Sequence, residues 1–98
     1  MAQIKATQEF TEWLNGLRDR TGRARIQARI ERLAGGNPGN YRNLKHNVSE
    51  LKIDVGPGYR VYYTHRKDVL ILLLCGGDKS TQRADIRLAY ELVKEVEL

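Results

Sequence analysis

Three cations and a phenol within residues 50–82 are the side chains of this chain best suited to chemistry. Lys52, Arg60 and Tyr62 lie in two predicted strands, and Lys79 follows a third strand at the entrance to a helix. Alternate residues of a strand point to the same face of a sheet. Lys52, Arg60 and Tyr62 are therefore expected on one open face, with Lys79 and the N–H groups of the helix start beside them. Such a set predicts contact with a phosphodiester.

A group of this kind could cut RNA without a metal ion, because the 2′-OH of RNA can attack the adjacent phosphorus. The protein would align the two oxygens, stabilise the added negative charge and move a proton. Arg60 suits charge stabilisation, since it stays protonated and can fork onto two phosphate oxygens. Lys52 or Lys79 would supply charge, or act as base if neighbouring cations lower its pKa, and Tyr62 could donate a proton. An exposed sheet face that is merely solvated explains the same residues equally well.

Further basic and polar side chains flank this group. Residues 35–47 are rich in glycine and asparagine and predict a long loop, and the last predicted helix starts soon after Lys79. An arginine-rich predicted helix before that loop could bind nucleic acid, but a solvated face or an acidic partner explains it as well. We predict RNA contacts from Arg42, Lys45, His46, Gln82 and Arg83.

The composition limits the classes of protein to consider. The chain has 98 residues, a net charge of +5 and 41% hydrophobic residues, which predicts one small basic domain. Cys75 is the single cysteine, so an intramolecular disulfide and a cysteine-based zinc site are excluded, as expected for the cytoplasm. Neither a metal nor another cofactor is predicted. The longest apolar run, residues 69–75, is far shorter than the roughly 20 residues that span a bilayer, so no membrane contact is expected.

The apolar pattern predicts an α+β fold in the order β-α-α-β-β-β-α. A small antiparallel sheet would carry an N-terminal helical hairpin and a C-terminal helix, with the helices mainly on one face. Glycines 35 and 36 should end the second helix. Strands are predicted over residues 1–6, 48–53, 59–65 and 69–75, and helices after the N-caps Thr7, Thr21 and Ser80. The inward-facing residues are expected to be Phe10, Trp13, Leu14 and Leu17, then Ile26, Ile30 and Leu33, and finally Ile86, Ala89, Val93 and Val96.

Two stretches of the chain resemble the RelE/ParE superfamily of type II toxin–antitoxin toxins, and the HigB-like "addiction module killer" branch in particular. These are T-Q-E-F-T-E-W-L-N-G-L-R-D and the segment from N-V-S-E-L-K-I through G-P-G-Y-R-V-Y-Y to G-G-D-K-S-T-Q. The resemblance covers nearly the whole chain, and it implies a single domain over residues 1–98. It implies a microbial-RNase-like fold and, in the RNase members, metal-independent cleavage of mRNA on the ribosome.

The resemblance also implies partners and site residues. It implies a cognate antitoxin with a helix-turn-helix DNA-binding domain, and operator DNA bound only through the antitoxin complex. The basic positions of the family fall on Lys52, Arg60 and Lys79, with Gln82 and Asp85 following in the same motif. Many RNase members carry a catalytic tyrosine or histidine near the C-terminus, whereas this chain ends in E-V-E-L, and Tyr62 is the substitute we expect. The same fold also serves ParE-like inhibitors of DNA gyrase and could serve a nontoxic binding module, so fold alone does not choose.

Overall fold

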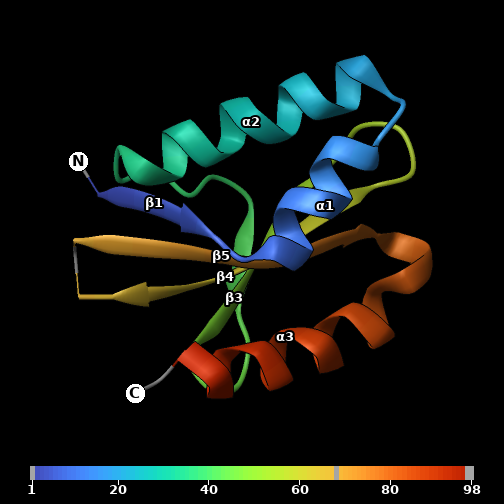
Figure 1. Cartoon of the computed structure of the whole chain (residues 1–98). Coiled ribbons are helices and arrows are strands. Elements are labelled where there is room, and N and C mark those ends of the chain that lie inside the picture. The colour runs from blue at the N-terminus through green and yellow to red at the C-terminus, as the bar shows by residue number, and fades with distance from the viewer. Residues whose placement is uncertain (1, 68, 97–98) are drawn as a thin grey trace.

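A five-stranded sheet forms the centre of the computed structural model, which describes residues 2–67 and 69–96 (Figure 1). Met1, at the start of the predicted first strand, lies outside the described residues. The α+β class and the predicted element order are confirmed, with one added strand. The elements are β1 Gln3–Ala6, α1 Gln8–Gly16, α2 Arg20–Ala34, β2 Tyr41–Asn43, β3 Val48–Ile53, β4 Tyr59–Arg66, β5 Leu70–Asp78, the short 3₁₀ helix Lys79–Thr81 and α3 Gln82–Val96.

The sheet has the order β1-β5-β4-β3-β2 and differs from the prediction at both edges. Strand β2 lies within residues 35–47, where a loop was expected; its three residues are all exposed, so no apolar alternation marks it. It pairs antiparallel with β3, as β3 does with β4 and β4 with β5. Strand β1 instead runs parallel to β5, with Gln3 opposite Leu70, so the sheet is mixed rather than purely antiparallel.

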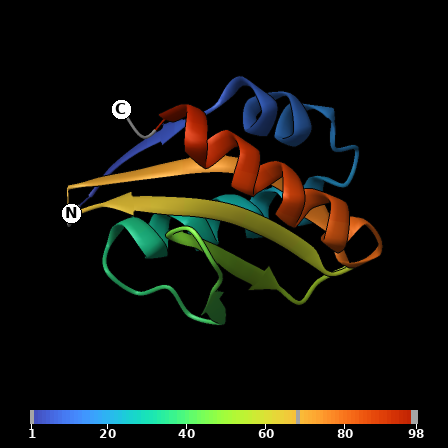
Figure 2. The same cartoon turned by 90° about the horizontal axis from the view of Figure 1, so that it is seen from below.

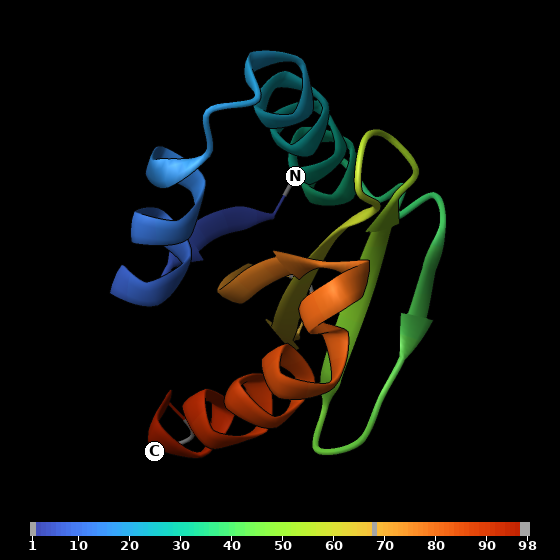
Figure 3. The same cartoon turned by 90° about the vertical axis from the view of Figure 1, so that its right-hand side faces the viewer.

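Helices cover both faces of the sheet, which corrects the expectation that they lie mainly on one. Figures 1 and 3 show α1 and α2 on one side and α3 on the other. Helix α3 needs this second face because its own buried residues, Ala89, Leu92 and Val93, pack against apolar side chains there. The view from below shows α3 lying across the strands (Figure 2). The side chains that face α3 include Val48, Tyr62, Leu74 and Cys75.

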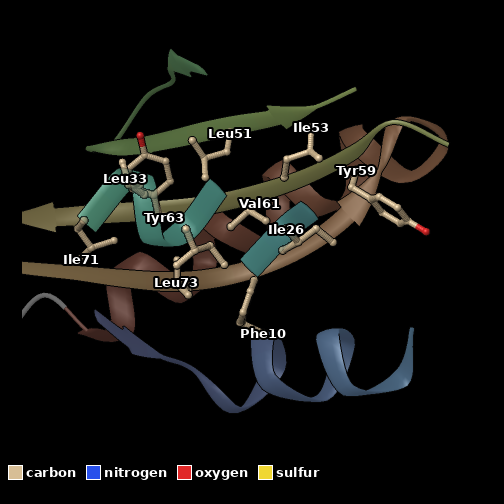
Figure 4. Close-up of a cluster of buried hydrophobic side chains, with 11 residues drawn as sticks. Phe10, Ile26, Leu33, Leu51, Ile53, Tyr59, Val61, Tyr63, Ile71 and Leu73 are labelled. Atoms are coloured by element: carbon tan, nitrogen blue, oxygen red, sulfur yellow. The ribbon is translucent and has the colours of Figure 1, made fainter. Parts of the chain in front are cut away.

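The larger apolar core lies between the sheet and the two N-terminal helices (Figure 4). The predicted inward residues Phe10, Ile26, Ile30 and Leu33 are all buried there, and each such side chain contributes about 1.5–3 kcal/mol. Trp13 is partly buried and lies so close to β5 that a Cβ atom on Gly76 would come within 2.3 Å of its ring. The remaining members are Leu51, Ile53, Tyr59, Val61, Tyr63, Ile71 and Leu73.

Helix starts agree with the predicted caps in one case of three. The Thr7 hydroxyl accepts a hydrogen bond from the Phe10 N–H at 3.1 Å, as expected. Asp19 rather than Thr21 caps α2, because its carboxylate accepts from the Gly22 N–H at 2.9 Å. Asp78 rather than Ser80 caps the 3₁₀ turn that leads into α3. No helix within the described residues is both long and apolar enough to cross a membrane.

Candidate anion-binding site

Lys52 and Arg60 are direct partners across the β3–β4 ladder. Their sequence neighbours Ile53, Tyr59 and Val61 belong to the core under α1 and α2, so Lys52 and Arg60 point to the opposite face. The predicted alternation of these strands is therefore confirmed. Both cations lie at the end of the sheet that is joined by the turn between β3 and β4.

Arg60 is a buried charge without an acidic partner. Only 8% of the residue is exposed. Its Nη1 donates to the carbonyl oxygens of Gly58 and Tyr59 at 3.2 and 3.3 Å, while Nε is buried with no hydrogen-bond partner. Within the described residues no carboxylate lies in ion-pair distance of it. Because a buried charge is costly unless it is paired, an anionic group beside this guanidinium would stabilise it.

Lys79 approaches Arg60 across the β3–β4 turn. A Cβ atom placed on Gly58 would lie 3.5 Å from Arg60 Nη1 and 3.6 Å from the Cβ atom of Lys79. Gly58 has a φ of +79°, a conformation that suits glycine, so the turn can pass between the two cationic residues. The structure thus brings together Lys52, Arg60 and Lys79, which we call the cation cluster.

Tyr62 does not share the exposure of the cation cluster. It lies on the same face of the sheet but is 0% exposed, because α3 covers it. Burial first, and the neighbouring Glu50 carboxylate second, raise the pKa of its hydroxyl far above the usual range. This corrects the expectation that Tyr62 lies on an open face, and substrate has no access to it in this structure.

Glu50 is a residue of this region that the sequence analysis did not single out. It lies opposite Tyr62 in the ladder and is 0% exposed. Arg42 Nε donates to its Oε1 at 2.7 Å, and Gln82 Nε2 donates to its Oε2 at 2.9 Å. Burial alone would raise the pKa of Glu50, but the hydrogen bonds from Arg42 and Gln82 outweigh it and the pKa is lowered. The alternation of β3 places Glu50 on the face of Lys52, opposite the core residues Leu51 and Ile53, but gives no sign that Glu50 is buried there.

Two of the other predicted RNA contacts, Lys45 and His46, lie apart from the cation cluster. The Lys45 N–H donates to the Tyr90 hydroxyl at 3.2 Å, and the His46 ring packs edge-on against Tyr90 with 5.0 Å between centroids. Tyr90 is in the second half of α3, whereas Lys79 precedes the helix. Lys45 and His46 thus border α3 on the side away from Lys79. Arg83 is exposed in the first turn of α3, nearer to the cation cluster.

Asp85 is the carboxyl group placed over the β5 partner of Arg60. That partner is Gly77, and a Cβ atom on it would fall 1.8 Å from Asp85 Oδ2. Thr81 donates to the same oxygen at 2.5 Å. Burial raises the pKa of Asp85, the Thr81 bond opposes this, and the charge of Asp78 adds to it; the net shift is upward. A carboxyl group with a raised pKa beside a basic site is suited to carry a proton.

The arginines of α2 differ in what they contact. Arg29 donates to the backbone oxygens of Lys52 at 2.7 Å and of Pro38 and Asn40 at 3.0 Å each, so it ties the helix to β3 and the segment before β2. A groove of about 420 Å³ lies between α2 and the end of β3, and Arg29 and the exposed Arg25 and Arg32 line it. Arg29 therefore has a structural role. For the exposed Arg25 and Arg32, nucleic-acid binding, a solvated face and an acidic partner remain the alternatives.

Comparison with known proteins identifies the family of the chain. Residues 12–94 match the profile of a family described as "Phage derived protein Gp49-like (DUF891)". A protein of Haemophilus influenzae, named only as uncharacterized, is 48% identical over 96 residues, which are 98% of this chain and 97% of the relative. No solved structure matches the chain.

Proposed function

The chain belongs to the Gp49-like family, a RelE-type, toxin-like family, and from this premise we propose that it is the toxin of a type II toxin–antitoxin module. Its activity is metal-independent, ribosome-dependent cleavage of mRNA, which inhibits translation. Within the superfamily the chain is of the HigB-like kind, as its sequence motifs suggest. Its partners are the ribosome, mRNA and a cognate helix-turn-helix antitoxin, which connects it to operator DNA, and it acts in the cytoplasm.

The observation that carries the nuclease proposal is the unpaired charge of Arg60. A guanidinium that is 8% exposed and has a buried Nε without a partner gives the fold no evident advantage. A phosphate oxygen at this position would provide the missing negative charge and acceptor. Lys52 and Lys79 flank the same position, so three positive charges can stabilise the extra charge of the pentavalent phosphorus.

The reaction needs only groups that RNA and this site supply. The 2′-oxygen forms a bond to phosphorus, the bond from phosphorus to the 5′-oxygen breaks, and a proton moves from the 2′-OH to the leaving oxygen. Arg60 stabilises charge and is already protonated, so it cannot take that proton. Lys52, Lys79 and Asp85 are the candidates for proton transfer. Tyr62, covered by α3, is not among them.

The proposal is tested by mapping mRNA 5′ ends by primer extension after induction of the protein. We expect new ends within translated messages for the wild type and none for Arg60→Ala. Lys94→Ala is the control, because Lys94 is an exposed cation in the last turn of α3, paired with Glu91. Circular dichroism verifies that each variant is folded. Cleavage by Arg60→Ala at the wild-type level would refute the site.

A supercoiling assay with purified DNA gyrase tests the competing ParE-like function. The nuclease proposal expects full gyrase activity in the presence of the protein. Inhibition of supercoiling together with unchanged mRNA ends would replace the nuclease by a gyrase inhibitor. Normal growth on induction of a folded protein, with neither effect, would instead indicate a nontoxic binding module.

A further inference from the structure

Glu50 is a full negative charge buried between three elements of the fold. Its carboxylate is 0% exposed and receives one hydrogen bond from β2 and one from the first residue of α3. An apolar residue would fill such a position at least as well if packing were its only purpose, since buried ion pairs rarely add stability over apolar residues of similar size. The charge at this position therefore calls for a purpose beyond packing.

The geometry of Arg42, the hydrogen-bond partner of Glu50, indicates what the buried charge does. Arg42 Nε is fixed at 2.7 Å from Glu50 Oε1, yet the Arg42 side chain is 46% exposed. Its Nη1 and Nη2 donate to no residue of the described chain, so they remain available for another acceptor. Strand β2 has only three residues, all exposed, and would not by itself hold a long side chain in place. The hydrogen bond to Glu50 therefore fixes the position of the otherwise flexible Arg42 side chain.

The Arg42 side chain lies next to the cation cluster, on the same face of the sheet. Arg42 is opposite Glu50 in the β2–β3 ladder, and Lys52 is two residues further along β3, opposite Arg60. Residues in such a diagonal relation have Cα atoms about 7–8 Å apart, which long side chains can bridge. A single strand of nucleic acid that crosses β4, β3 and β2 would meet Arg60, Lys52 and Arg42 in turn.

We propose that Glu50 is a positioning residue that holds the Arg42 guanidinium against a second phosphate of the RNA, next to the phosphate bound by the cation cluster. This inference rests on the proposed function, because it assumes that the bound polymer is RNA. Glu50 itself does not touch the substrate. It acts through Arg42, while its second oxygen, held by Gln82, keeps the carboxylate aligned with the start of α3.

A double-mutant cycle on binding tests the proposal without requiring cleavage. The probe is a fluorescent single-stranded oligonucleotide whose sugars lack the 2′-OH, so it cannot be cut by the proposed route. We expect Arg42→Ala to weaken binding about tenfold, as for the loss of one charged hydrogen-bonded contact. The slope of log K against log salt should fall by about 0.7, the value for one phosphate of a single strand. Glu50→Gln should weaken binding by a similar factor, because one of its two acceptor oxygens becomes a donor.

The coupling between the two changes separates positioning from a merely structural role. If Glu50 acts through Arg42, adding Glu50→Gln to Arg42→Ala should cause no further loss of affinity. Arg42→Lys should keep a contact with Glu50 but lose the planar fork, and should therefore bind more weakly than the wild type. Lys94→Ala is the control for loss of a distant exposed charge. In a ¹H–¹⁵N correlation spectrum, the Arg42 Nε–H signal should be sharp in the wild type and broader in Glu50→Gln, where the side chain is less firmly held.

Several outcomes would overturn the proposal. They are additive losses in the cycle, an unchanged salt slope for Arg42→Ala, an unchanged NMR signal in Glu50→Gln, or no binding of the oligonucleotide by the wild type. Failure of the nuclease proposal looks different. A wild-type protein that binds with the expected coupling but cuts no mRNA would refute cleavage and leave the positioning role of Glu50 in place.

Discussion

Replacing Arg60 by methionine separates the role of this residue in function from its role in stability. The change removes a buried Nε that has no partner, which relieves about 1–3 kcal/mol. It also removes two Nη1 hydrogen bonds of 3.2 and 3.3 Å, which are long and belong at the weak end of their class, about 1.5 kcal/mol each. The opposing contributions leave a net loss of about 0–2 kcal/mol. We therefore expect the free energy of unfolding of Arg60→Met to fall by at most about 2 kcal/mol relative to the wild type.

Urea unfolding monitored by the fluorescence of Trp13, the single tryptophan, measures this directly. The comparison variant is Ile26→Ala, a truncation in the core, where we expect a loss of about 2–5 kcal/mol. The melting temperature in the presence of inorganic phosphate is a second measurement. If Arg60 receives an anion, phosphate should raise the melting temperature of the wild type, and raise it less in Arg60→Met. In cells, Arg60→Met should cut no mRNA although it is folded.

A large loss of stability would refute this reasoning. If Arg60→Met unfolds as easily as Ile26→Ala, Arg60 is retained for its bonds to the carbonyls of Gly58 and Tyr59 rather than for a ligand. An equal effect of phosphate on both proteins would lead to the same conclusion.

Three further predictions concern the core and the buried titratable groups. Gly76→Ala should lower the free energy of unfolding by about 1–3 kcal/mol and shift the Trp13 fluorescence, because the new Cβ would meet the indole at 2.3 Å; Gly16→Ala, with open space around it, should have little effect. Because the pKa of Glu50 is lowered in the folded state, its contribution to stability is present above pH ~4.5 and is lost as the pH falls further. In urea unfolding from pH 3 to 7, the free energy of unfolding should therefore fall more steeply with acid for the wild type than for Glu50→Gln. Parallel curves for the two proteins would contradict this. Burial raises the pKa of the Cys75 thiol to about 12, so Ellman's reagent at pH 8 should react only as fast as the protein unfolds, and immediate reaction of the folded protein would disprove it.

Sequence reasoning succeeded where one short-range rule decides the outcome. The two-residue period of β3 and β4 sufficed to place Lys52 and Arg60 on one face. Thr7 was recognised as a cap because it precedes a clear apolar stripe. Asp19 and Thr21 are both acceptable caps by residue type. Asp19 prevails in a structure where it also accepts a hydrogen bond from the Tyr59 hydroxyl at 2.9 Å, forty positions away in the chain.

Long-range packing decided the features that were missed. The alternation of β4 identifies the face of Tyr62 but contains no information that α3 will cover that face. The role of Glu50 depends on its hydrogen bonds with Arg42 and Gln82, which belong to different elements and approach it only in the folded protein. Strand β2 is exposed at every residue, so its pairing with β3 left no apolar pattern to read.

The parallel pairing of β1 with β5 has a consequence for the synthesis of the protein. The Thr7 hydroxyl bonds to the carbonyl of Leu74, a separation of 67 residues, and Gln3 pairs with Leu70 close by. On the ribosome the N-terminal segment therefore waits for β5 before its own strand has a neighbour, and contacts so distant in sequence slow folding. Because Lys79 and α3 are translated later still, the face that carries the cation cluster is completed only when nearly the whole chain has been synthesised.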